Sequence, residues 1–250
     1  MNKSHLLVIF IVSLVLGWQL FRVGYYPMHD DLQVMRMYQM DKCFQDGQIP
    51  CRWVPDMGYG YGQPMFNFYS ALPYYLGQFL HLFGLSFVDT VKIVFYLSLL
   101  ISGLAAYLLA SIFIPPLSAL IASIAYLSFP YHALDIFVRG AMAESWGIAL
   151  VPLVLYALLK YLSNPNRKIG VFLSLTLFAL TITHNITTLI AVPIFLLFGL
   201  WGIIKYKPPI KSIRQTLLYC LLGVALSGFF TLPLTFEKNL IQTQFFTADY

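Results

Sequence analysis

Long apolar runs limit what this chain can fold into. The first run, HLLVIFIVSLVLGWQLFRVG at residues 5–24, is about as long as the roughly 20 residues that cross a bilayer as a helix. Charged residues make up only 10% of the 250 positions, whereas about 25% is usual in a soluble domain. The mean hydropathy is +0.75. Together these features predict an all-α, polytopic membrane protein.

The apolar runs predict about seven membrane spans. The first run lacks a small-x-small cleavage site, which favours an uncleaved anchor over a signal peptide. Residues 66–84 contain Pro73 and many tyrosines, so we expect a juxtamembrane or re-entrant helix there that does not cross. The other expected spans are 87–113, 117–129, 146–162, 169–183, 187–204 and 215–234.

Two basic loops set the expected orientation. KYLSNPNRK (160–168) and KYKPPIKSIR (205–214) contain no acid, and loops of this kind stay on the cytoplasmic side. Lys3 places the N-terminus there too, which requires an even number of crossings before residue 160. Residues 25–86 then form the first outer loop of a single transmembrane domain that covers 1–250. The net charge of +5 lacks the spacing of a nucleic-acid site, so we expect no nucleic-acid partner.

The first outer loop opens with an amphipathic pattern. DLQVMRMYQMDKCFQD (31–46) places apolar side chains such as Leu32 and Tyr38 near one face, which predicts a helix lying on the membrane interface. Cys43 and Cys51 are in the same loop. They fit either a disulfide in an oxidising compartment or two unpaired thiols, and the sequence leaves both open.

Two adjacent carboxylates follow the first span directly, in YPMHDDLQVMR (26–36). Asp30 or Asp31 could act as a general base, and the pair could bind a divalent cation such as Mg²⁺ or Mn²⁺, with Glu144 as a further ligand. The alternative is an acidic stop that holds the loop outside. Acidic residues contribute little to orientation, so a catalytic role is favoured.

Further candidates lie in two later outer segments, 129–145 and 183–185. Glu144 could be a second catalytic acid, or a helix N-terminal acid stabilised by the helix dipole. Arg139 suits a phosphate, with an interfacial snorkelling role as the alternative. His184 could contact substrate or cap a helix. The complete set of candidate substrate or phosphate contacts is His29, Arg36, Tyr59, Tyr61, Arg139, His184 and Asn185.

Four stretches carry a family resemblance: MHDDLQVMRMYQM (28–40), DGQIPCRWVPDMGYGYGQPMFNFYSALPYYLG (46–77), VRGAMAE (138–144) and THN (183–185). They resemble prokaryotic polytopic membrane proteins labelled 6-pyruvoyl-tetrahydropterin synthase-related. Nothing in the chain resembles a soluble pterin enzyme or its zinc histidines. The architecture is similar to the GT-C glycosyltransferases, in which an acidic residue follows the first span. Asp30 matches that position best and Asp31 next, while Glu144 or Asp135 matches a second acidic site.

The resemblance implies a function. It implies transfer of a sugar from a polyprenyl-phosphate donor to an acceptor on the outer face of a prokaryotic plasma membrane, with the lipid bilayer and the donor as partners. GT-C proteins are usually longer, so the chain resembles an N-terminal portion of such an enzyme. Two alternatives remain: a transporter or flippase, which the nearly charge-free spans disfavour, and a non-catalytic protein of envelope assembly.

Overall fold

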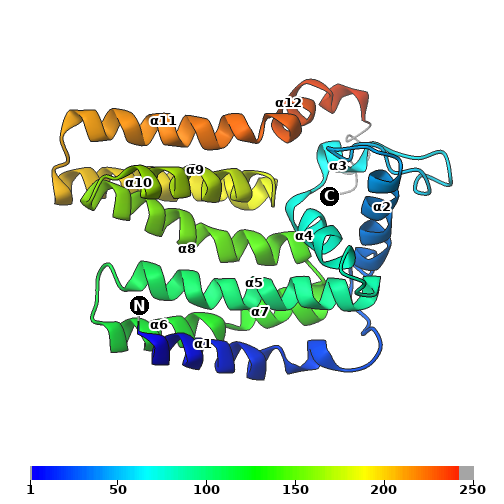
Figure 1. Ribbon diagram of the computed structural model, residues 1–250, viewed down its shortest axis with the longest axis horizontal. Helices are drawn as coiled ribbons and strands as arrows, with labels where there is room; N and C mark the ends of the chain where they lie inside the picture. Colours follow the sequence, from blue (N-terminus) through cyan, green and yellow to red (C-terminus); the bar gives the residue numbers. More distant parts are fainter. Residues whose placement is uncertain (1, 242–250) are drawn as a thin grey trace, which may run out of the picture.

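The computed structural model describes residues 2–241, which form helices and, within that range, no strand. Seven helices form the main body of the molecule and extend mainly along its long axis in Figure 1. They are α1 (Lys3–Leu16), α5 (Phe87–Ala110), α6 (Pro116–Leu127), α8 (Met142–Ser163), α9 (Arg167–Thr181), α10 (Asn185–Tyr206) and α11 (Ile210–Leu226). The bundle confirms the predicted all-α class.

Fewer helices are long enough to cross a membrane than the seven spans that the sequence predicts. Within residues 2–241, α5, α8 and α10 are long and apolar enough to cross a membrane. Two bent pairs raise the number to 5 if each pair is one span: α6 with Pro130–Arg139, bent by 42°, and α11 with α12 (Gly228–Phe236), bent by 69°. Helices α1 and α9 have 14 and 15 residues, fewer than the roughly 20 that a bilayer requires.

The break between α11 and α12 interrupts the span expected at 215–234. It falls at Ser227 and Gly228, and the Ser227 hydroxyl donates to the Val224 carbonyl at 2.6 Å. A Ser–Gly pair whose hydroxyl bonds back to the preceding turn is a recognised cause of a sharp kink. The single span that the apolar run predicts is therefore two helices.

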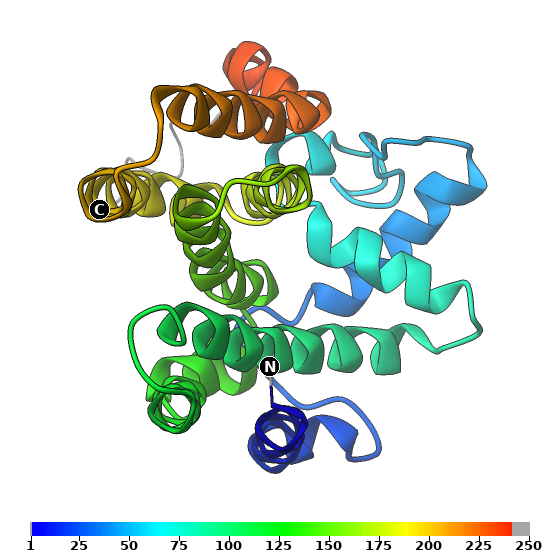
Figure 2. The same cartoon turned by 60° about the vertical axis from the view of Figure 1, so that its left-hand side comes forward.

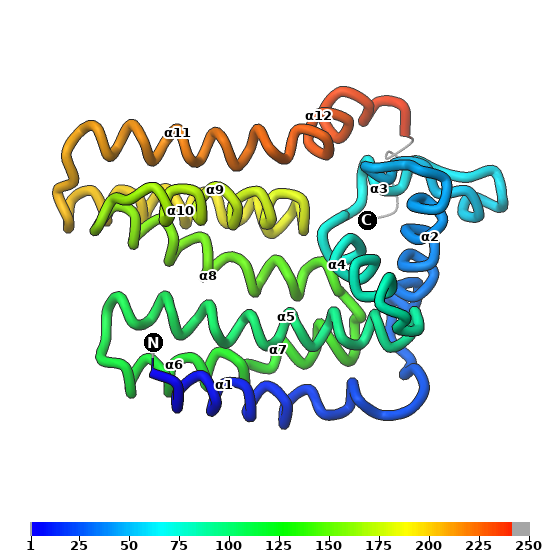
Figure 3. Tube along the Cα trace, viewed as in Figure 1, coloured from blue at the N-terminus to red at the C-terminus, as the bar shows by residue number. Residues whose placement is uncertain are grey.

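A group of shorter helices covers one end of the bundle: α2 (Gln33–Gln45), α3 (Met65–Phe68) and α4 (Leu72–His81). Figure 3 shows the chain leaving α1, turning through this group and returning into α5. The 10 residues of α4 extend only about 15 Å as a helix, half of a bilayer core of roughly 30 Å. The expectation that residues 66–84 do not cross fits this length.

Helix α2 is amphipathic as expected, but the predicted apolar face is only partly buried. Met40, which belongs to that face, is fully buried together with Met37, whereas Leu32 and Tyr38 are exposed. The packing partners of α2 are α4 and α5. The helix therefore forms part of the folded domain, and its neighbours fix the position of the segment that precedes it.

Cys43 and Cys51 form a disulfide, which settles the pairing that the sequence leaves open. Both are buried, and the Cys51 amide donates to the Tyr75 hydroxyl at 3.0 Å. The disulfide ties the end of α2 to the loop that follows it, and the hydrogen bond to Tyr75 joins that loop to α4.

We expect the double variant Cys43→Ser/Cys51→Ser to unfold at a lower temperature than the wild type. The closed loop spans a sequence separation of 8, and a loop of that size contributes about 2–3 kcal/mol to the free energy of unfolding. Thermal unfolding in detergent, with and without reductant, measures the effect. Reductant should destabilise the wild type and leave the variant unchanged. Equal melting temperatures under both conditions would contradict the assignment.

Polar contacts fix α8 against α5 near the end that carries α2–α4. The hydroxyls of Ser98 and Ser145 are hydrogen-bonded at 3.1 Å, and the Trp146 indole donates to the Val94 carbonyl at 3.1 Å. Such hydrogen bonds hold helices together where lipid surrounds the bundle. Helix α5 itself begins where the sequence predicts, because the Ser86 hydroxyl accepts the Asp89 amide at 3.1 Å. The first turns of α8 are therefore firmly positioned.

Candidate functional site

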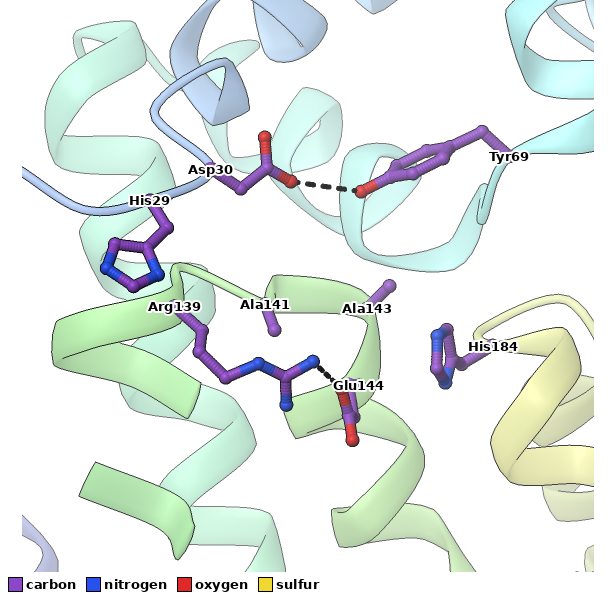
Figure 4. Close-up of a pocket in the computed structure, with 8 residues that line it drawn as sticks. All are labelled: His29, Asp30, Tyr69, Arg139, Ala141, Ala143, Glu144 and His184. Carbon is purple, nitrogen blue, oxygen red and sulfur yellow. Dashed lines mark hydrogen bonds and ion pairs between the residues drawn. The ribbon is translucent and has the colours of Figure 1, made fainter. Parts of the chain in front are cut away.

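A cavity of about 370 Å³ lies at this end of the bundle, where four parts of the chain meet. Figure 4 shows its lining, which comes from the loop after α1, the segment after α3, residues 139–144 leading into α8, and the corner before α10. The lining residues are His29, Asp30, Tyr69, Arg139, Ala141, Ala143, Glu144 and His184. Six of the eight carry ionisable groups of the kinds that bind or transform polar substrates.

A helix end brings the loop of Asp30 to Arg139. The π-helical segment η2 (Leu134–Arg139) ends at Gly140, and the last carbonyls of a helix lack partners within it. The amides of His29 and Asp30 donate to the carbonyls of Val138 and Arg139, both at 2.9 Å. The loop after α1 is therefore joined by its backbone to a segment more than 100 residues away.

Gly140 makes this junction possible. Its φ of +66° lies in the left-handed region, which glycine adopts without steric cost. A Cβ at this position would also lie 2.3 Å from the Met28 sulfur and 2.8 Å from the Asp30 carbonyl oxygen. The Gly140 carbonyl accepts a further hydrogen bond from the Gln33 side chain at 2.7 Å.

One carboxylate oxygen of Asp30 is fully engaged and the other is not. Oδ2 accepts from Arg36 at 2.7 Å and from Gln33 at 2.9 Å, and the Tyr69 hydroxyl lies 3.5 Å away. Within residues 2–241, no hydrogen bond reaches Oδ1. The side chain is 33% exposed. Asp30 is thus held by one oxygen, while the other has no hydrogen-bond partner among the described residues.

The groups that hold Asp30 are buried or partly buried. Gln33 is fully buried and accepts from the Tyr74 hydroxyl at 2.6 Å. The Arg36 guanidinium lies 4.5 Å from the centre of the Tyr69 ring, a cation–π distance. Burial raises the pKa of the Tyr69 phenol, with a smaller contribution from the Asp30 charge. Tyr69 therefore stays protonated at neutral pH and can donate a hydrogen bond.

Arg139 is the centre of a second network, opposite Asp30. Its guanidinium donates to Asp135 at 2.6 Å and to the Tyr131 hydroxyl at 2.9 Å, and it pairs with Glu144 at 2.8 Å. Tyr131 in turn donates to Glu144 at 2.6 Å. Asp135 is completely buried, and its second oxygen has no partner within residues 2–241. Arg139 therefore compensates one buried and one accessible carboxylate.

His184 closes the third side of the pocket. Its Nδ1 lies 2.7 Å from the Thr187 hydroxyl and accepts the Thr187 amide at 3.4 Å, which caps α10. With Nδ1 as the acceptor, the neutral ring carries its proton on Nε2. Burial lowers the pKa of His184 below 6.5, against an opposing contribution from Glu144. A neutral imidazole thus borders the pocket at pH 7 (Figure 4).

The lowered pKa of His184 predicts a pH dependence of stability. The pKa of His184 lies below 6.5 in the folded protein and near 6.5 in the unfolded chain. As the pH falls below about 6.5, the unfolded chain binds this proton first, and stability is lost. His184→Asn keeps a good helix cap but does not titrate. Between pH 7.5 and 5.5 the melting temperature of the wild type should fall more than that of the variant. Parallel curves would contradict the prediction.

The structure brings together some of the residues that the sequence singles out. His29, Asp30, Arg139, Glu144 and His184 line one pocket. Arg36 does not line the pocket, but its guanidinium forms an ion pair with Asp30, which does.

Other candidates lie elsewhere. Asp31 is exposed and Asn185 begins α10, and neither lines the pocket. Tyr59 and Tyr61 are 103% and 87% exposed. The glycines around these tyrosines have positive φ, which forms a tight loop that projects the two rings away from the protein. The sequence-based expectation of substrate contact by these rings therefore has no support in the geometry.

The carboxylates do not form a metal site. Within residues 2–241 there is no group of three His, Cys, Asp or Glu side chains that could hold a metal ion. Asp30 is paired with Arg36 and Glu144 with Arg139, while Asp31 is exposed outside the pocket. The expected cation site at Asp30, Asp31 and Glu144 thus lacks the donor geometry it requires.

Several residues of the site escape sequence reasoning. Gln33 donates to the Gly140 carbonyl and Tyr131 donates to Glu144. Gln33 lies within the family stretch 28–40, but its residue type and position give no sign of this role, and Tyr131 lies outside all four stretches. Tyr69 belongs to an aromatic-rich stretch, which by itself indicates an interfacial belt as well as a groove. Only the contact between distant loops reveals the roles of these residues.

The fold and the site define a class: a helical membrane protein with an ionisable pocket at one end of its bundle. Residues 66–244 match the model of the 6-pyruvoyl-tetrahydropterin synthase related domain, a membrane protein family. The chain belongs to this family. The matched range includes Tyr69, Arg139, Glu144 and His184, while His29 and Asp30 precede it.

A relative at the sequence level is an uncharacterized protein of Lactococcus lactis subsp. cremoris (strain MG1363), which is 23% identical over 244 residues. The alignment covers 93% of this chain but only 39% of the relative. No solved structure matches the chain.

Proposed function

We propose that this protein transfers a sugar from a polyprenyl-phosphate donor to an acceptor at the non-cytoplasmic face of a prokaryotic plasma membrane. The observation that carries the proposal is that Asp30, whose Oδ1 has no hydrogen-bond partner within residues 2–241, lines one pocket together with Arg139, Glu144 and His184. Carboxylates, a guanidinium and an imidazole together supply the acceptors and donors that sugar hydroxyls and a phosphate require.

In the proposed reaction Asp30 is the general base. Oδ1 accepts the proton of the acceptor nucleophile as that nucleophile forms a bond to the anomeric carbon. The bond from that carbon to the phosphate oxygen breaks, and polyprenyl phosphate leaves with the electron pair. Displacement from the opposite side inverts the anomeric centre. Arg36 and Gln33 hold Oδ2 throughout, so the base is positioned before the acceptor arrives.

Arg139 and His184 are the proposed phosphate contacts. The Nε2–H of neutral His184 can donate to a phosphate oxygen, and the partly exposed Arg139 guanidinium supplies positive charge. Donors placed where charge develops in the transition state are usually the largest single contribution to catalysis. Glu144 already pairs with Arg139, so it orients the guanidinium and competes with an incoming anion.

The orientation is also a proposal, supported by two features at opposite ends of the bundle. The disulfide joins the end of α2 to the loop after it, at the end of the bundle that carries α2–α4. The basic loops 160–168 and 205–214 lie at the other end, as expected of cytoplasmic loops. Helices α1 and α9, which pack against α5 and α8, would then complete seven crossings with the three long helices and the two bent pairs.

The proposal is tested with the purified chain in proteoliposomes that contain polyprenyl-phosphate sugars with a labelled sugar. Transfer should release polyprenyl phosphate and give a product of inverted anomeric configuration. A parallel assay follows movement of the unchanged donor between leaflets, which a flippase would catalyse. Donor movement without sugar transfer would overturn the proposal in favour of transport.

A further inference from the structure

A second cavity, of about 620 Å³, lies between α8, α9, α10 and α11 and does not overlap the catalytic pocket. Helix α10 contacts mainly α8, and α11 contacts mainly α9. The two helices therefore stand apart after the loop that joins them, as Figure 2 shows. This separation leaves a space that is open on the side where a membrane would surround the bundle.

The cavity has no polar group available to a ligand. Its lining is aliphatic and aromatic except for Cys220 and three threonines, Thr181, Thr188 and Thr216. Each threonine hydroxyl donates to a carbonyl of its own helix, at 2.8, 2.9 and 2.9 Å. Water requires two or more polar partners in such a space, so a hydrocarbon chain suits the cavity better.

One mouth of the cavity lies beside a cluster of positive charge. Ile203 and Ile213 line the cavity near the end of α10 and the start of α11. These helix ends and the connection between them carry Lys205, Lys207, Lys211 and Arg214. All four are exposed, and no carboxylate within residues 2–241 pairs with them. Basic residues beside a gap between membrane helices are a recognised arrangement for lipid phosphates.

We propose that this cavity binds an anionic phospholipid of the surrounding bilayer, with an acyl chain between α10 and α11 and the phosphate on the basic connection 205–214. The two halves of the site have the two chemistries of such a lipid: an apolar space within the helices and uncompensated cations at its mouth. The site lies away from the catalytic pocket and does not depend on the proposed reaction.

The chain offers a substitution that fills the cavity with little disturbance. Gly199 lines the cavity, and a Cβ built there meets only the Leu158 side chain, at an ordinary 3.8 Å. Gly199→Leu therefore occupies the space of the acyl chain and removes a helix-weakening glycine. Lys211→Gln/Arg214→Gln removes two charges at the mouth. Arg167→Gln/Lys168→Gln removes two charges from the other basic loop and serves as the matched control.

Native mass spectrometry of the full chain in detergent, with phosphatidylglycerol or phosphatidylcholine of identical acyl chains, tests the proposal. The wild type should retain phosphatidylglycerol preferentially. Lys211→Gln/Arg214→Gln should lower its retention by about fivefold per lost cation, and Gly199→Leu should abolish most of it. The control pair should behave like the wild type.

Three results would overturn the lipid site. One is equal retention of both lipids by the wild type, which would indicate ordinary boundary lipid. Another is an equal loss in the two charge-removing pairs, which would indicate attraction by the whole basic face. The third is wild-type binding of phosphatidylglycerol by Gly199→Leu, which would show that the cavity is not occupied.

Discussion

Arg139→Met is expected to lose about 3–5 kcal/mol of stability, because it leaves a buried carboxylate without its partner. Asp135 has no exposed surface, and Arg139 is its hydrogen-bonding partner at 2.6 Å. For a chain of this length the melting temperature should fall by roughly 6–20 °C. Thermal unfolding in detergent, followed by tryptophan fluorescence, measures the change.

A second substitution separates loss of the charge pair from loss of packing. In the Arg139→Met background, Asp135→Asn removes the stranded charge, so the double variant should be more stable than Arg139→Met alone. Arg167→Gln, at an exposed arginine outside both networks, should unfold as the wild type does. If the two substitutions at 135 and 139 simply add, Asp135 does not depend on Arg139 and the proposed coupling is wrong.

Asp30→Asn is expected to lower the rate of sugar transfer by about 10²–10⁴-fold, the usual contribution of a general base. The amide oxygen can still accept from Arg36 and Gln33, as Oδ2 does now, so the loop should keep its place. The change should therefore appear in kcat, with little change in KM, because the variant lacks the group that takes the proton.

The neighbouring carboxylate provides the matched control. Asp31 is exposed and does not line the pocket, so Asp31→Asn should transfer sugar at the wild-type rate. Each variant loses one negative charge, and the two positions are adjacent. A change in surface potential should therefore affect both rates equally and drop out of the comparison between them. Equal rates for the two variants would remove Asp30 from the mechanism.

Much of the fold follows from local patterns. The apolar runs predict the positions of α5, α8 and α10, because a lipid-spanning helix requires a long stretch free of charge. Ser86 marks the start of α5, because its hydroxyl accepts a hydrogen bond from the amide of Asp89, three residues later. The kink at Ser227 is not visible in hydropathy, since it depends on one hydroxyl bonding within its own helix.

The site is less accessible to sequence reasoning than the fold. Expecting the polar residues at one membrane face places Asp30, Arg139, Glu144 and His184 together, and the structure brings them into one pocket. The same reasoning includes Asp31, although adjacent side chains in a turn point in different directions. It cannot find Gln33, whose partners are a carbonyl of a helix end and a tyrosine 41 residues away.

The central claim is that this pocket holds the donor, and photocrosslinking tests it most directly. A polyprenyl-phosphate sugar with a photoreactive group on the sugar is bound to the wild-type protein, irradiated, and the labelled peptides are identified. The account predicts labels within residues 26–36 and 139–146, which excess unlabelled donor suppresses. Labels confined to other regions, or labelling that competitor does not reduce, would contradict it.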